Sequence, residues 1–156
     1  MNDKAERRWR LEQLLHKQRS KQKNEYSVLF KECLESLGEN TIILSEGESA
    51  KVYNALQNQF PFSPWARIDW DQVSTKTTAD DVDEIVSTLN KMDQHVKDSV
   101  FILWSGSGHP VLQVELHKVI HSIDDVLAVD FDTYIFRPSK FVIEFYHEGE
   151  VTIGLV

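Results

Sequence analysis

The sequence predicts an α/β fold: a single domain with a mixed sheet and helices, a C-terminal antiparallel β-meander, and a basic helical extension in front. Two patterns indicate this fold. Helical spacing of apolar residues alternates with short strand-like runs along most of the chain, and residues 133–155 hold three strand-like runs with tight connections. A length of 156 residues, with 41% hydrophobic and 27% charged residues, is typical of one globular domain. We therefore expect an extension over residues 1–24 and one domain over residues 25–156.

The first part of the domain reads as helix, strand and helix. Apolar residues recur at helical spacing over residues 26–37. Residues 41–44 form a short apolar strand. Ser45 is followed three residues later by Glu48, the pattern of a capping box, which predicts a helix as far as about residue 59.

A loop and a third helix follow. Residues 60–71 contain two prolines and four aromatic residues, and the prolines disfavour both a regular helix and a central strand. The polar residues 74–78 are predicted to form another loop. Thr78 or Asp80 then caps a helix over residues 80–94, whose acidic first turn suits the positive end of the helix dipole.

The second part of the domain begins with residues 99–104, a continuous apolar run typical of a strand buried on both faces. After a glycine-containing turn, Pro110 begins a predicted helix that carries Leu112 and Leu116 on one face. The remaining segments are predicted to be an acidic turn or short helix at 122–130, a strand at 133–136, and a hairpin of 141–147 and 150–155.

Charge divides the chain into two parts. The formal net charge is −8, but residues 1–23 hold eight basic and three acidic residues, a net +5, and the other 133 residues carry a net −13. An acidic body repels phosphate backbones, which argues against nucleic-acid binding by the body and permits a basic protein partner. Solubility alone is the alternative explanation. The extension is either a solvated segment or a contact for nucleic acid or an anionic surface.

The single cysteine, Cys33, excludes an internal disulfide, and its place on an apolar helix face predicts an unreactive core thiol. No run of about 18 apolar residues is present, so no membrane span is expected. The N-terminus lacks the apolar core of a signal peptide. These features predict a cytoplasmic protein.

Motifs for catalysis are weak. The turn Gly106–His109 follows a strand, but it lacks the lysine of a nucleotide-binding P-loop and the third glycine of a dinucleotide-binding loop. His117 and His121 have a metal-compatible spacing, without the glutamate of a zinc-protease motif. We therefore predict no catalytic residue, cofactor or metal. The alternative is a small enzyme or phospholigand-binding protein that uses the Gly106–His109 loop with the two histidines.

Acidic residues beside aromatic ones are the more informative pattern. Aromatic anchors surrounded by charge are typical of tight protein–protein interfaces. In the hairpin, Val142, Glu144 and Tyr146 share one strand face, which is either an acidic surface or a face covered by helices. The predicted partner-binding residues are Asp69, Trp70, Asp130, Asp132, Glu144, Tyr146, Glu148 and Glu150.

Three segments carry a resemblance to a known family. They are residues 141–154 (FVIEFYHEGEVTIG), residues 29–34 (LFKECL) and residues 62–70 (FSPWARIDW). Together they resemble the immunity proteins of bacterial contact-dependent growth inhibition systems. The resemblance covers residues 26–156, and the basic extension lies outside it.

The resemblance implies a role without chemistry. Such proteins bind the C-terminal toxin domain of a neighbour's surface-delivered effector in the cytoplasm, and the toxin is commonly a nuclease. A nuclease must be basic to hold nucleic acid, so an acidic inhibitor would occupy its cleft and associate rapidly. The sequence does not indicate the toxin's substrate or an oligomeric state.

Overall fold

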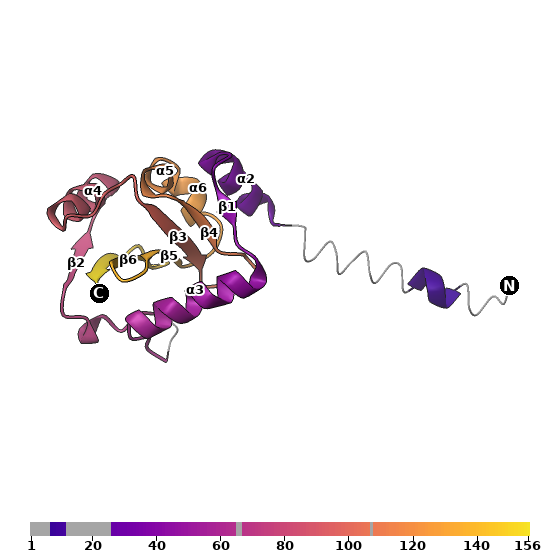
Figure 1. Cartoon of the computed structure of the whole chain (residues 1–156), viewed down its shortest axis with the longest axis horizontal. Helices are drawn as coiled ribbons and strands as arrows, with labels where there is room; N and C mark the ends of the chain where they lie inside the picture. The colour runs from indigo at the N-terminus through magenta and orange to yellow at the C-terminus, as the bar shows by residue number, and fades with distance from the viewer. Residues whose placement is uncertain (1–6, 12–25, 65–66, 107) are drawn as a thin grey trace.

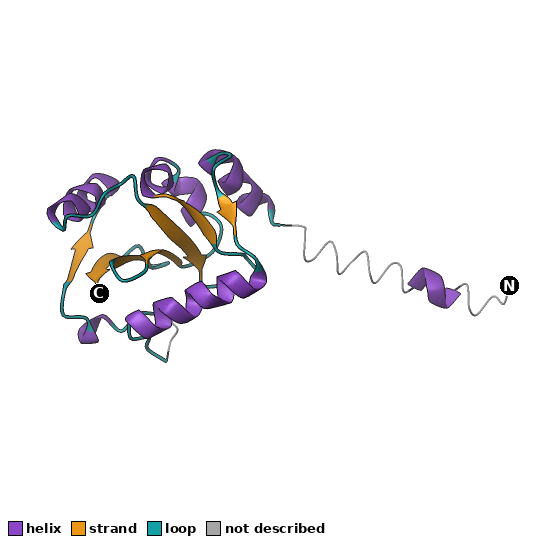
Figure 2. Ribbon diagram, viewed as in Figure 1, coloured by secondary structure: helices purple, strands orange, loops and turns teal. Residues whose placement is uncertain are grey.

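The computed structural model describes residues 7–11, 26–64, 67–106 and 108–156. Residues 7–11 are helical. The other residues of the predicted basic extension lie outside the described ones, so only this short part of the helical prediction is confirmed. The described domain contains helices and strands in about the predicted alternation, which confirms the α/β class (Figure 2).

Seven strands form one sheet in the order β1-β4-β3-β5-β6-β7-β2. The strands are β1 (Ile42–Ile43), β2 (Lys76–Ala79), β3 (Ser99–Trp104), β4 (Leu112–Glu115), β5 (Thr133–Arg137), β6 (Phe141–Phe145) and β7 (Val151–Leu155). Every strand pair among the described residues is antiparallel, whereas the sequence predicts a mixed sheet. The reason is that helices here do not link neighbouring strands in parallel crossovers. The C-terminal meander β5-β6-β7 is confirmed.

The first three helices of the domain begin and end near the predicted residues, whereas the fourth begins later than predicted. They are α2 (Val28–Leu37), α3 (Glu46–Gln59), α4 (Val82–Lys91), α5 (Leu116–His121) and α6 (Ile123–Leu127), with a short 3-10 helix η1 (Trp70–Gln72). The predicted capping box of α3 is present, since Ser45 and Glu48 accept each other's backbone N–H. Asp81 caps α4 in place of Thr78 or Asp80.

Helices cover both faces of the sheet (Figure 1). Helix α3 lies along one face, and α2, α4, α5 and α6 lie on the other. Neighbouring residues of a strand point to opposite faces. Ile102 and Ile143 therefore pack into the core beneath α2, α4, α5 and α6, while Leu103 and Val142 pack into the core beneath α3. The hairpin face that carries Val142 and Glu144 is therefore covered, in agreement with the second of the two alternatives that the sequence leaves open.

Two predicted segments have a different structure. Residues 112–115 form strand β4, and a helix begins only at Leu116. The helical spacing of Leu112, Leu116 and Ile120 predicts a helix. In the structure, β4 pairs with β1 and β3, and the alternating residues Leu112 and Val114 are the buried ones. Residues 76–79, which overlap the predicted polar loop 74–78, form the edge strand β2, which pairs with β7. An edge strand has one unpaired side, so a polar sequence is tolerated there.

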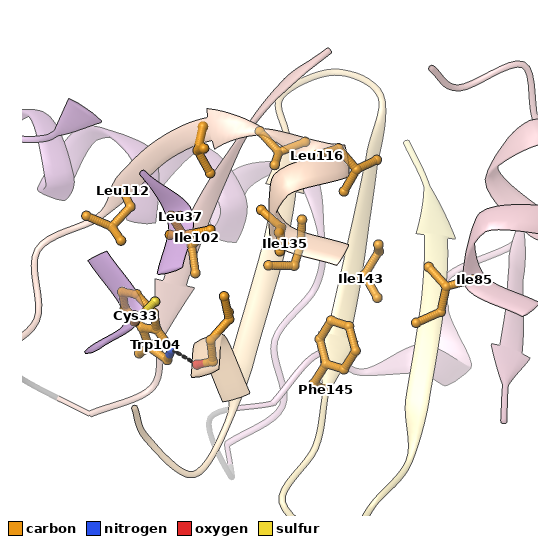
Figure 3. Close-up of a cluster of buried hydrophobic side chains, with 14 of the residues drawn as sticks. Cys33, Leu37, Ile85, Ile102, Trp104, Leu112, Leu116, Ile135, Ile143 and Phe145 are labelled. Carbon is orange, nitrogen blue, oxygen red and sulfur yellow. Dashed lines mark hydrogen bonds between the residues drawn. The ribbon is translucent and has the colours of Figure 1, made fainter. Parts of the chain in front are cut away.

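The core beneath α2 surrounds Trp104 (Figure 3). This indole is fully buried and donates its N–H to the Val126 carbonyl at 3.0 Å, which joins β3 to α6. Cys33 of α2 lies beside it and is also fully buried, as predicted. Burial, reinforced by the negative charge of Asp125, raises the pKa of the Cys33 thiol to about 12. Separately, no helix in the described residues has the length and apolar content to cross a membrane.

The Cys33 environment predicts slow labelling by thiol reagents. With its pKa raised from 9.0 to about 12, the thiolate fraction at pH 8 falls about 1000-fold relative to an ordinary cysteine. In a colorimetric disulfide-exchange assay, the native chain should react very slowly. The same sample in concentrated urea should react completely, because the chain has no other cysteine. Equal rates in the two conditions would contradict a buried thiol.

Candidate functional site

One end of the sheet gathers most of the predicted partner-binding residues. Trp104, Thr133, Phe145, Val151 and Ala79 pair in a single row across five strands. The loops beyond this row contain residues 80–81, 105–106, 130–132 and 146–150, which we call the acidic end of the sheet. Five predicted residues lie in it: Asp130, Asp132, Tyr146, Glu148 and Glu150. Acidic residues far apart in the sequence thus come together through the strand order.

Glu144 lies just inside the acidic end and holds the aromatic loop onto the sheet. Its side chain is 0% exposed. Its carboxylate accepts three hydrogen bonds, from Arg67 Nη2 at 2.9 Å, the Ile68 backbone N–H at 2.9 Å and Trp70 Nε1 at 3.0 Å. These three donors come from the loop that the sequence predicts at residues 60–71. Glu144 is therefore committed to contacts within the chain and presents no carboxylate at the surface.

Arg67 links this buried acid to the surface. A second hydrogen bond joins its Nη2 to Glu150 Oε2 at 3.3 Å, and its guanidinium carbon lies 3.9 Å from the centre of the Tyr146 ring. Burial alone lowers the pKa of Arg67, but the hydrogen bonds and charges of Glu144 and Glu150 outweigh it and raise the pKa above the ordinary value. The guanidinium is thus a permanent cation that orders Tyr146 and Glu150.

Trp70 closes the loop against β7. A side chain at Gly154 would bring its Cβ within 2.6 Å of Trp70 Cζ3, so glycine is needed for this approach. Beside Trp70, a depression of about 340 Å³ is lined by Ser63, Arg67, Ile68, Asp69, Asp71 and Glu150 as well. Asp69 and Trp70 therefore border the acidic end, and Trp70 packs onto the sheet as well as lining this depression.

The loop 130–132 is held at both flanks. Asp132 Oδ1 accepts the His147 backbone N–H at 2.8 Å and lies 3.0 Å from His147 Nδ1. The Asp132 backbone pairs with Ser105. Asp130 Oδ1 accepts the Phe131 backbone N–H at 2.8 Å. These bonds fix the loop between β3 and the hairpin turn.

The glycine turn of the alternative hypothesis packs against the same loop. A Cβ at Gly106 would lie 1.9 Å from Asp130 Oδ2, so this glycine makes room for a carboxylate. His109 stacks on Phe30 with ring centres 5.6 Å apart, and its Nε2 lies 3.6 Å from Asp130 Oδ2. Strand β4 follows the turn, so it does not lead into the helix N-terminus that a phosphate loop uses. This geometry favours packing over phosphate binding.

His117 and His121 do not belong to a metal-binding group within the part of the chain that the structure describes. His117 contacts the Glu115 carboxylate, and both His117 and His121 are exposed. Within residues 7–11, 26–64, 67–106 and 108–156, no three His, Cys, Asp or Glu side chains form a group able to hold a metal ion.

Three further residues of this region are not among the predicted partner-binding residues. Arg67 and His147 are the partners of the predicted acids, and Phe131 is the most exposed aromatic side chain of the described domain. A signal existed for Arg67, since it is the one basic residue of the aromatic loop 60–71. The pairing of His147 with Asp132 depends on contacts between segments distant in the sequence, which local patterns do not reveal.

Comparisons with known proteins give one match over most of the chain. A family model described as "CdiI immunity protein EcoliA0-like" matches residues 27–154. A shorter match reaches the uncharacterized protein YqzI of Bacillus subtilis (strain 168), at 61% identity over 33 residues. That match covers 21% of this chain and 64% of YqzI, so the chain spans less than two-thirds of that protein.

The three bonds of Glu144 predict a large stability loss in Glu144→Ala. Removing the acceptor leaves the Ile68 N–H and the Trp70 Nε1 without their partner and leaves Arg67 paired with Glu150 alone, which costs about 3–5 kcal/mol. Glu148→Ala, in the exposed turn of the same hairpin, is the matched control, with a change within about 0.5 kcal/mol. Urea unfolding followed by tryptophan fluorescence measures both. Equal stability of the two variants would contradict the anchoring role of Glu144.

Proposed function

The chain belongs to the family of CdiI immunity proteins, and from this premise we propose that it neutralises one cognate toxin domain by binding it through the acidic end of the sheet. The toxin would be a nuclease, and the complex would form in the cytoplasm. The observation that carries this proposal is the gathering of Asp130, Asp132, Glu148 and Glu150 at one end of the molecule. In this proposal the protein acts as a stoichiometric inhibitor and does no chemistry.

Charge supports a basic partner. Residues 24–156 carry a net −13, and the exposed carboxylates of Glu148 and Glu150 lie on the hairpin turn of the acidic end. A nuclease cleft must attract phosphates, so it is positive and complements such a surface. Blocking the cleft would prevent the toxin from reaching nucleic acid. Steering by opposite charges would also make association fast.

The contacts of the aromatic loop support a toxin-binding surface that is rigid before the toxin binds. Arg67 fixes Glu150 and Tyr146, while Glu144 fixes the loop itself. A surface that is ordered before binding loses less entropy when the complex forms. Among the predicted contacts, Glu144 then acts by positioning Arg67, and the outer carboxylates meet the toxin.

The rate of association with the toxin domain should depend on the salt concentration and on where a charge is reversed on the surface of the immunity protein. The probe is a catalytically inactive form of the cognate C-terminal toxin domain. For the unaltered chain, we expect the association rate to fall about 10-fold or more between 20 and 300 mM salt. Glu148→Lys should slow association at low salt several-fold more than Glu39→Lys, which makes the same charge change beyond the opposite end of the sheet.

Stopped-flow fluorescence measures these rates, and co-expression with the active toxin domain tests protection of growth. Growth arrest despite co-expression would contradict the immunity role. Protection together with an association rate indifferent to salt would retain that role and overturn the electrostatic mechanism.

A further inference from the structure

Phe131 has an exposure that its surroundings do not explain. Its side chain is 80% exposed, while the flanking side chains of Asp130 and Asp132 are only 14% and 15% exposed. In this loop, therefore, the apolar residue points to solvent and the charged residues point inward. This is the reverse of the arrangement that solvation favours.

The loop is built to hold this arrangement. The Phe131 backbone N–H donates to Asp130 at 2.8 Å, and Asp132 is tied on its other side to His147 and Ser105. The Phe131 ring meets the His147 ring edge-on, with centres 6.3 Å apart, and His147 in turn packs on Tyr146 at 4.2 Å. A chain of contacts therefore connects Phe131 to Tyr146 and Arg67.

We propose that Phe131 is the central anchor of the toxin interface and inserts into an apolar notch within the toxin's basic surface. This inference rests on the proposed function and deepens it. The partner's chemistry follows from the surroundings. The Phe131 ring contacts His147 of the hairpin turn, and the exposed carboxylates of Glu148 and Glu150 in the same turn call for Lys or Arg around the notch. Aromatic side chains near the centre of an interface, within a polar rim, are typical of interface hot spots.

The inference changes the role of the two aspartates. Their carboxylates are mostly buried and accept hydrogen bonds from this chain. Asp130 and Asp132 therefore act as positioning residues that present Phe131, and Glu148 and Glu150 supply the charges that the toxin meets directly. Gly106 contributes to the same loop arrangement, because only a residue without a Cβ leaves space for the Asp130 side chain.

The first test compares two exposed apolar residues. The full-length chain and its variants are titrated against the catalytically inactive cognate toxin domain by surface plasmon resonance. Phe131→Ala should weaken binding about 30-fold or more, mainly through faster dissociation. Val28→Ala, which removes a side chain that is 69% exposed on α2, should change affinity less than about twofold. Both variants should keep the thermal midpoint of the unaltered chain, since neither side chain is in the core.

The second test separates positioning from direct contact by a double-mutant cycle. If Asp132 acts through Phe131, Asp132→Ala weakens binding in the unaltered background but has little further effect in Phe131→Ala. It should also leave the salt dependence of association unchanged. Additive losses, together with a smaller salt dependence, would instead show that Asp132 meets a toxin cation directly and would overturn its positioning role.

The outcomes distinguish a failure of the anchor role of Phe131 from a failure of the proposed immunity function. If the unaltered chain binds the toxin domain and Phe131→Ala binds as tightly, the anchor role is overturned and the immunity function stands. If the unaltered chain does not bind, the proposed function fails and the anchor role fails with it.

Discussion

The buried carboxylate of Glu144 is the interaction on which the acidic end depends. It lies in the middle of the meander, out of contact with water, and binds three donors of the aromatic loop. A buried charge is tolerated only when it is paired and fully hydrogen-bonded, so the loop and the sheet specify each other. Through Arg67, the same carboxylate also determines where Tyr146 and Glu150 lie.

Acidic residues of one hairpin thus have different physical roles because of strand geometry. Glu144 belongs to strand β6, lies on the same face as Val142 and binds the aromatic loop that covers it. Residues 148 and 150 lie in or beside the turn, where no layer of helices covers them. The same side-chain chemistry therefore anchors a loop in one place and contributes to the surface potential a few residues later.

The order of the strands is what makes the acidic end continuous. Strands β5, β6, β7 and β2 are neighbours, and each has its acidic flanking residues at the same end. Antiparallel pairing places the start of one strand beside the end of the next, so acids that precede β5 and β7 meet those that follow β6 and β2. Such a surface is complementary to a positively charged one.

Local patterns in the sequence were enough to predict the α/β class, the capped helix at Ser45, the C-terminal meander and the buried thiol of Cys33. Each depends on residues close together in the chain, through helical spacing, strand alternation or a capping contact. Only the tertiary structure decided that residues 112–115 and 76–79 are strands, that Glu144 is buried beneath Arg67, and that Asp132 turns inward while Phe131 faces solvent. Those features depend on partners tens of residues away, and pairing energy between distant segments outweighs the weak local preferences of short runs.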